Sequence, residues 1–128
     1  LGFDRDDEKS VRHTIEMASN SKLDFACFNF LTPLPGTEVY QQLVGEKRLT
    51  NRNWADYNMA NLVFEPTRMS GETLEREMRN AWLDFYSLKA ICKRLGFRWK
   101  KFHPFIWLIN LALFYYTHTK IKRIKSPA

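Results

Sequence analysis

Cysteine is scarce in this sequence. Among 128 residues only Cys27 and Cys92 are cysteines, and they do not have the spacing of a metal-binding motif. Both stand in apolar segments, and a free cysteine is often buried, so we expect two unreactive thiols in the core. A reducing cytoplasm is the default compartment for such a chain.

Acidic residues are missing from the last part of the chain. Residues 1–88 hold 10 Lys and Arg and 14 Asp and Glu, whereas residues 89–128 hold 10 Lys and Arg and no acid, which gives net charges of −4 and +10. A block of one sign can face an anionic partner such as phospholipid or nucleic acid. A solvated basic tail is the alternative.

A hydrophobic run long enough to cross a membrane is also missing. The longest apolar stretch, "HPFIWLINLALFYYTH" at residues 103–118, is shorter than the roughly 20 residues that a span needs. We therefore expect a helix that is either buried or lies at an interface. Its basic flanks and its aromatic residues suit a membrane surface. Packing against another part of the protein would explain the same pattern.

The chain does not begin with methionine, and its first residues, "LGFDRDD", resemble the end of a strand. We therefore expect a fragment of a longer protein. The content of 45% hydrophobic and 15% aromatic residues is typical of a folded chain and not of a disordered tail.

Periodicity predicts alternating strands and helices in the first half of the chain. Asp6 or Asp7 can cap a first helix, and the run "LDFACFNFL" is apolar on both alternating faces, as a parallel strand covered on both sides would be. Gly96 ends the third helix. The expected strands are residues 1–4, 23–31 and 61–66, and the expected helices are residues 8–19, 38–44, 70–95 and 103–118.

The loop "FLTPLPGT" at residues 30–37 has an unusual composition for a simple turn. Pro33 and Pro35 fix their own backbone and push the residues before them toward extended geometry. Gly36 allows a turn or a close approach to a ligand, and Thr37 can cap the next helix. The loop is therefore either a ligand-binding loop or only a strand-to-helix connection.

The order of these motifs resembles one family. "GFD" at a strand end, "LTPLPGT", "GEKRL", "VFEPTRMS" and "FYS" follow one another over residues 1–95 as in the C-terminal part of radical S-adenosylmethionine enzymes, in the branch that carries a cobalamin-binding domain. Each motif is weak alone, and the ordered series carries the resemblance.

The resemblance implies an α/β fold: C-terminal βαβα units of a partial (β/α) TIM-like barrel over residues 1–69, followed by a helical extension over residues 70–128. It implies radical-mediated methyl transfer or related C–H chemistry. The cofactors would be S-adenosylmethionine, a 4Fe-4S cluster and cobalamin. The CxxxCxxC cluster motif is absent here, so the cluster and cobalamin would belong to upstream parts of the same polypeptide, and this chain alone would be inactive.

The resemblance also assigns the cofactor-binding residues. Gly2, Phe3 and Asp4 match the strand end near the adenosyl group. The next strand and its loop would lie over the cofactor or substrate through Asn29, Thr32, Pro33, Pro35, Gly36 and Thr37. From the residues alone, Asn29 is either such a site residue at a strand end or a structural asparagine.

The sequence offers no catalytic acid, base or nucleophile and no metal ligand set. His13, His103 and His118 fit surface or core positions. The alternative function is a small basic module that binds a membrane surface or another anionic partner through residues 89–125. Nucleic acid fits less well, because the aromatic residues there belong to an apolar helix. The expected location is cytoplasmic, with a membrane surface as a further partner.

Overall fold

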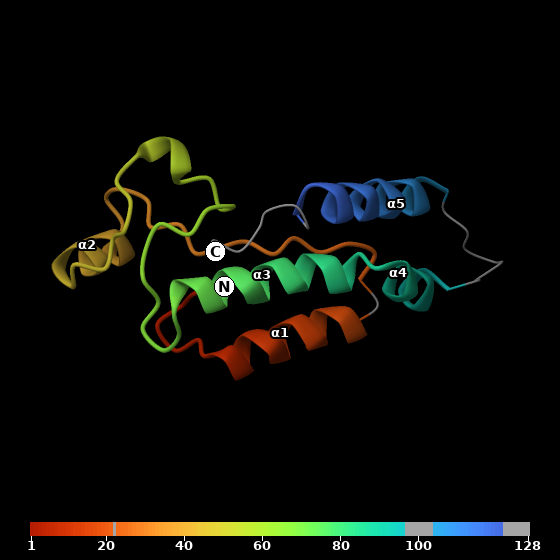
Figure 1. Ribbon diagram of the computed structural model, residues 1–128, viewed down its shortest axis with the longest axis horizontal. Coiled ribbons are helices and arrows are strands. Elements are labelled where there is room, and N and C mark those ends of the chain that lie inside the picture. Colours follow the sequence, from red (N-terminus) through yellow and green to blue (C-terminus); the bar gives the residue numbers. More distant parts are fainter. Residues whose placement is uncertain (22, 97–103, 122–128) are drawn as a thin grey trace. The chain divides into compact units, whose positions relative to one another are not determined.

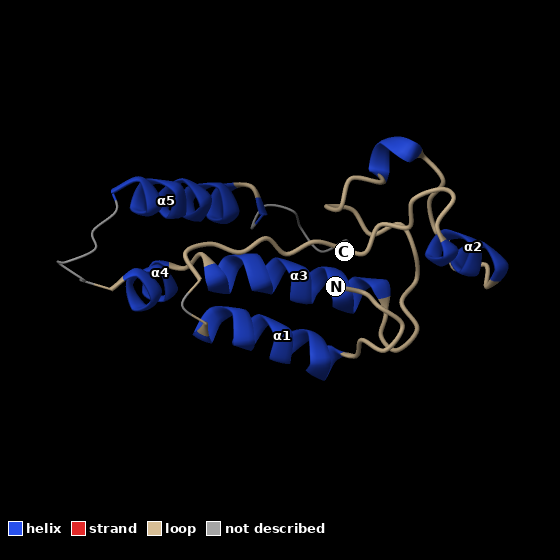
Figure 2. Cartoon of the chain, turned by 180° about the vertical axis from the view of Figure 1, so that it is seen from behind, coloured by secondary structure: helices blue, strands red, loops and turns tan. Residues whose placement is uncertain are grey.

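The computed structural model describes residues 1–21, 23–96 and 104–121, and the regular secondary structure of these residues is helical (Figure 1). The helices are α1 (Glu8–Asn20), α2 (Glu38–Gly45), the short 3-10 helix η1 (Trp54–Asp56), α3 (Gly71–Phe85), α4 (Leu88–Leu95) and α5 (Pro104–Thr119). Figure 2 shows loops and helices but no strand among the described residues.

The described chain divides into two compact units. The first consists of Leu1–Val11 and Phe28–Met78, and the second consists of Arg12–Cys27 and the residues from Arg79 onward. Helices α1 and α3 each supply residues to both units. The predicted domain boundary between residues 69 and 70 stays a prediction.

Side-chain caps fix where three of the helices begin. The Asp7 carboxylate accepts a hydrogen bond from the backbone N–H of Ser10 at 2.8 Å, and the Ser10 hydroxyl accepts one from the N–H of Asp7 at 2.9 Å. Thr37 caps α2 and Ser87 caps α4 in the same way. A cap pairs backbone donors that a helix leaves open, which confirms the predicted starts of α1 and α2.

The long helix predicted over residues 70–95 is wrong, because the chain breaks between α3 and α4. Ser87 caps a new helix there, so its hydroxyl accepts from the N–H of Ala90 at 3.2 Å. The apolar stripe of α3 is buried up to Phe85, but beyond the break Leu88 is exposed and Ile91 is the buried residue. Gly96 follows the last turn, at φ +57°, as predicted.

The first unit has a small apolar core behind an isolated antiparallel bridge between Leu49 and Phe64. Leu43, Val63 and Phe64 are its buried residues. Partly buried apolar side chains pack around them: Leu31, Leu49, Tyr57 and Leu62. Hydrogen bonds on both sides of the bridge, from Thr50 N–H to the Val63 carbonyl and from Glu65 N–H to the Arg48 carbonyl, hold the two segments in register.

The second unit is built around aromatic and polar contacts. Tyr86 is buried, and its hydroxyl donates to the carbonyl of Ala26 at 2.8 Å. The rings of Phe85 and Tyr86 meet edge to face, and the Arg94 guanidinium lies 3.6 Å from the centre of the Phe85 ring. Asn110 of α5 is completely buried beside Arg94.

The predicted α/β barrel fold is wrong. Residues 23–31 and 61–66 form no strand ladder. Of residues 1–4, only Leu1 exchanges backbone bonds with residues 23–31, through the Asn29 carbonyl and the Leu31 N–H. A parallel strand needs a continuous row of backbone partners along its edge. The next bond in this segment, from Phe30 N–H, goes to a different neighbour, Met59.

The misreading of residues 23–31 came from their composition. Apolar residues on both alternating faces predicted burial on both sides, but only Phe28 and Phe30 are buried. On the other face Leu23 and Phe25 are exposed. Cys27 and Cys92 are exposed as well, so the expected core position of both thiols is also wrong.

Helix α5 confirms the last predicted helix. Within the described residues no helix combines the length and the apolar character needed to cross a bilayer. Of the predicted basic surface at residues 89–125, residues 97–103 and 122–125 lie outside the described part of the chain.

Candidate functional site

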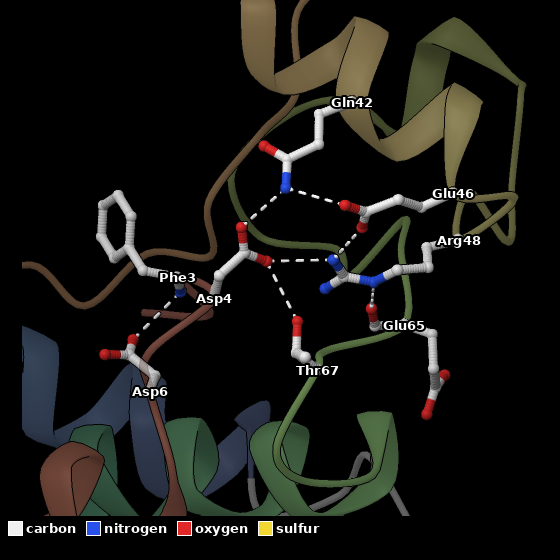
Figure 3. A network of polar contacts seen from close by, with 8 residues as sticks. All are labelled: Phe3, Asp4, Asp6, Gln42, Glu46, Arg48, Glu65 and Thr67. Carbon is white, nitrogen blue, oxygen red and sulfur yellow. Dashed lines mark hydrogen bonds and ion pairs between the residues drawn. The ribbon is translucent and has the colours of Figure 1, made fainter.

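An open polar pocket of about 550 Å³ lies in the first unit. It is lined by Asp4, Gln42, Glu46, Arg48, Glu65, Pro66 and Thr67. Figure 3 shows six of them as sticks, with Asp4, Glu46 and the backbone oxygen of Glu65 around the Arg48 guanidinium. We call these seven residues the Asp4–Arg48 pocket.

Arg48 is the centre of the hydrogen-bond network in the pocket (Figure 3). Its Nη1 lies 2.9 Å from Asp4 Oδ1 and 2.6 Å from Glu46 Oε2, and its Nε donates to the backbone carbonyl of Glu65 at 2.8 Å. The bridge between Leu49 and Phe64 positions Arg48, because it sets Arg48 directly before one bridge residue and Glu65 directly after the other.

Asp4 receives further hydrogen bonds from two other segments. The Gln42 amide of α2 donates to Asp4 Oδ2 at 3.0 Å, and the Thr67 hydroxyl donates to Oδ1 at 3.0 Å. The same Gln42 amide donates to Glu46 Oε1 at 2.9 Å. The pocket therefore ties together the amino-terminal segment, the end of α2 and the loop before α3.

These contacts shift the pKa values of the pocket residues so that the charged form of each is favoured. Hydrogen bonds from Arg48 and then Thr67 lower the pKa of Asp4, and hydrogen bonds from Arg48 and then Gln42 lower the pKa of Glu46. Burial lowers the pKa of Arg48, but its bonds to Glu46 and Asp4 outweigh that effect and raise it. Around neutral pH all three side chains are therefore charged.

The pocket can still accept a ligand. Asp4 and Glu46 supply two carboxylates against the single guanidinium of Arg48, so a cation or a group with several N–H or O–H donors is favoured. Arg48 Nη2 is buried and has no hydrogen-bond partner among the residues that the structure describes.

Of the nine residues predicted to bind a cofactor, Asp4 lines this pocket. Gly2 is buried against Leu74 and Phe64, and Phe3 is exposed. Asn29 bonds through its backbone carbonyl to Leu1, and the Thr32 hydroxyl bonds to the carbonyl of Phe30. These positions do not test a ligand role, so the assignment of Gly2, Phe3 and Asn29 stays a prediction.

The predicted ligand loop has local explanations for its unusual residues. Pro33 is fully buried, whereas Pro35 is exposed. Gly36 has φ +86°, which favours glycine, and a Cβ atom there would meet no atom within 4 Å. Thr37 is the N-cap of α2. The loop is accounted for as a connection, and its predicted ligand role stays a prediction.

Sequence reasoning missed Gln42, Glu46, Arg48, Glu65 and Thr67 as site residues. One local signal was available: Gln42 and Glu46 stand four residues apart, a spacing at which helical side chains meet. The contacts of Asp4 with Arg48 and Thr67 span 44 and 63 residues of sequence, and no local pattern reveals such pairs.

We expect Arg48→Met to lower the free energy of unfolding by about 1–2 kcal/mol at pH 7, because it removes hydrogen bonds and leaves like charges together. The carboxylates have lowered pKa values in the folded state, so their stabilisation is present above their ordinary values near 4 and is lost as the pH falls below them. The difference between the variant and the wild type should therefore shrink between about pH 5 and pH 2. Urea unfolding at a series of pH values measures it. An unchanged difference at low pH would mean that the ion pairs do not stabilise the fold.

Similar known proteins are methyltransferases by name. Bacteriochlorophyllide d C-12(1)-methyltransferase of Chlorobaculum tepidum is 29% identical over 113 residues, which are 88% of this chain and 24% of that protein. The uncharacterized methyltransferase PH0819 of Pyrococcus horikoshii is 28% identical over 86 residues, 67% of this chain and 19% of that protein. Bacteriochlorophyllide d C-8(2)-methyltransferase of Chlorobaculum tepidum is 23% identical over 104 residues, 81% of this chain and 22% of that protein.

The chain thus spans between 19% and 24% of the length of these relatives. No family model matches the chain, and no solved structure matches it significantly.

The predicted membership in the radical S-adenosylmethionine enzymes is wrong by these comparisons and by the structure. The relatives are named only as methyltransferases, and the described residues contain no strand of the barrel that the resemblance implied. The 4Fe-4S cluster and cobalamin were inferred from that resemblance alone, so their assignment loses its support.

Proposed function

We propose that this chain is part of a methyltransferase that uses S-adenosylmethionine as the methyl donor. The names of three relatives support methyl transfer, and they match between 67% and 88% of this chain. The partner in this proposal is the remainder of a longer polypeptide, since the chain spans at most 24% of those relatives.

The charge pattern of the Asp4–Arg48 pocket is the observation that supports this pocket as the binding site of S-adenosylmethionine. S-adenosylmethionine supplies a methyl group on a sulfonium cation, and it also carries an ammonium, a carboxylate and two ribose hydroxyls. The carboxylates of Asp4 and Glu46 suit the cationic and hydroxyl groups. The guanidinium of Arg48, which lines the pocket, suits the carboxylate.

In this proposal the residues of the chain bind and orient the donor. Asp4 is held by three hydrogen bonds from Arg48, Gln42 and Thr67, so its carboxylate is fixed before a ligand arrives. A fixed acceptor loses little conformational entropy on binding. The volume of about 550 Å³ is within the range of small-molecule sites.

We expect Asp4→Asn to weaken binding of S-adenosylmethionine about tenfold or more, because the neutral amide loses the attraction for a cation and breaks the contact with Arg48. Isothermal titration calorimetry with S-adenosylmethionine on the full chain measures this. Glu75→Gln is the control, since Glu75 is an exposed carboxylate of α3 that does not line the pocket.

Equal affinity in the wild type and in Asp4→Asn would remove the pocket from the proposal. Absence of methyl transfer from labelled S-adenosylmethionine by the full-length protein, with a bacteriochlorophyllide as acceptor, would count against the activity in the form that the relatives' names suggest.

A further inference from the structure

Helix α5 exposes apolar side chains and buries polar ones, the reverse of a helix on a protein surface in water. Asn110 and Thr117 are 0% exposed. Large apolar side chains of the same helix are open to solvent: Phe105 at 70%, Leu108 at 64%, Leu111 at 43%, Tyr115 at 70% and Tyr116 at 54%. We call these five residues the α5 apolar face.

The five residues form one continuous face. Their spacings of three, three, four and one residues place them within less than half of the circumference of a helix that turns 100° per residue. Asn110 and Thr117 lie on the opposite side, as the Asn110 contacts with Arg94 and with the backbone of Asp24 confirm. The orientation of α5 is thus fixed by hydrogen bonds on its polar side.

The composition of the face limits what can cover it. Helix α5 has 16 residues, which at about 1.5 Å per residue gives about 24 Å, less than the apolar thickness of a bilayer. Such a helix can lie in a membrane surface but cannot cross it. Tyr115 and Tyr116 combine an apolar ring with a polar hydroxyl, as side chains at a membrane interface do.

The net charge of the sequence segment that contains the face favours one kind of partner. Helix α5 contains no acidic residue, and residues 89–128 carry a net charge of +10. This charge attracts an anionic surface and repels a second copy of the same segment. An apolar face within a basic sequence segment matches an anionic lipid surface in both apolar character and charge, whereas a nucleic acid offers phosphates but no apolar layer.

We propose that the α5 apolar face binds the surface of an anionic lipid bilayer, with α5 lying in the plane of the headgroups. This binding does not depend on the proposed methyl transfer. It would hold the chain where a membrane-associated substrate can be reached.

The test is cosedimentation of the full chain with vesicles of phosphatidylglycerol and phosphatidylcholine, against vesicles of phosphatidylcholine alone. We expect at least tenfold tighter binding to the anionic vesicles at low salt, and a smaller difference at 0.5 M salt because salt screens charges. The apolar part of the binding should persist at high salt.

The double variant Leu108→Gln and Tyr115→Gln should weaken vesicle binding at least tenfold. A matched double variant, Met17→Gln and Leu88→Gln, removes two apolar side chains that are 60% and 50% exposed on other helices, and it should bind as the wild type does. All four substitutions are at exposed positions, and circular dichroism spectra check that both variants fold.

Three results would overturn the proposal. The first is no cosedimentation of the wild type with anionic vesicles. The second is equal loss of binding in the two double variants. The third is self-association of the wild type in sedimentation velocity that the Leu108 and Tyr115 variant abolishes, since this would assign the face to a second copy.

Discussion

Gly2→Ala should lower the free energy of unfolding by about 2–4 kcal/mol. Gly2 has φ +100°, where an L side chain is strained by about 1–2 kcal/mol. A Cβ atom at Gly2 would also lie 3.0 Å from Leu74 Cδ2 and 3.1 Å from Phe64 Cζ, and both neighbours are fully buried. Overpacking of this kind costs about a further 1–3 kcal/mol.

Gly36→Ala is the matched control for this prediction. Gly36 has a similar φ of +86°, but a Cβ atom there would meet nothing within 4 Å. Its cost should therefore be the backbone strain alone, about 1–2 kcal/mol. Urea unfolding followed by circular dichroism measures both variants. Equal losses at the two positions would mean that the contacts with Leu74 and Phe64 relax without cost.

The comparison also separates two roles of Gly2. The sequence predicted that Gly2 lies near a cofactor, and the structure shows that it lies against the core of the first unit. If Gly2→Ala lowers stability as expected while S-adenosylmethionine binding per folded molecule stays unchanged, the glycine is needed for packing alone.

Local signals in the sequence were sufficient for most helices. Asp7 and Thr37 mark the starts of α1 and α2, and their hydrogen bonds to residues three positions on are present. Ser87 carried the same signal inside the predicted helix of residues 70–95. The prediction treated the apolar residues on both sides of Ser87 as one helix. Their spacing of four and three residues continues across the short break, so the spacing alone does not reveal where one helix ends and the next begins.

The fold class could not be read from the same kind of signal. An apolar run such as residues 23–31 is compatible with a buried strand or with an extended loop that buries alternate residues. The two differ in the backbone partners along the edges, which belong to distant parts of the chain. Here Phe28 and Phe30 are buried while Leu23 and Phe25 are not, so the run is covered on one side.

Of the residues that line the candidate site, the sequence analysis named one. Asp4 was selected from the motif at the amino terminus, and it does line the pocket. Arg48, which organises the pocket, reaches Asp4 across 44 residues through the register of the bridge between Leu49 and Phe64. Such a register depends on packing of the core and is not encoded in a short pattern.

Asn110→Leu should lower the free energy of unfolding by about 2–4 kcal/mol, although it replaces a polar residue by an apolar one at a fully buried position. The Asn110 amide donates to the carbonyl of Asp24 at 3.0 Å, and its Oδ1 accepts from Arg94 Nη2 at 3.1 Å. Leucine would leave a carbonyl and a guanidinium without these partners, and each such loss costs about 1–3 kcal/mol in a buried place.

Arg94 makes this loss larger than that of a neutral pair. Burial lowers the pKa of Arg94, which shows that its charge is already disfavoured by the surroundings. Its Nε is buried without a hydrogen-bond partner in the described ranges. Its other contacts among the described residues include the carbonyl and the ring of Phe85 and the ring of Tyr86, and the Asn110 bond is its hydrogen bond to a side chain.

Asn80→Leu is the control, because Asn80 is an exposed residue of α3 and the same change there should alter stability by less than about 0.5 kcal/mol. The double variant Arg94→Met and Asn110→Leu tests the cause. Removing both partners of a buried bond costs less than the sum of the single changes, so we expect a coupling of at least about 1 kcal/mol. Strictly additive losses, or an Asn110→Leu chain as stable as the wild type, would show that burial of the α5 polar side does not depend on this bond.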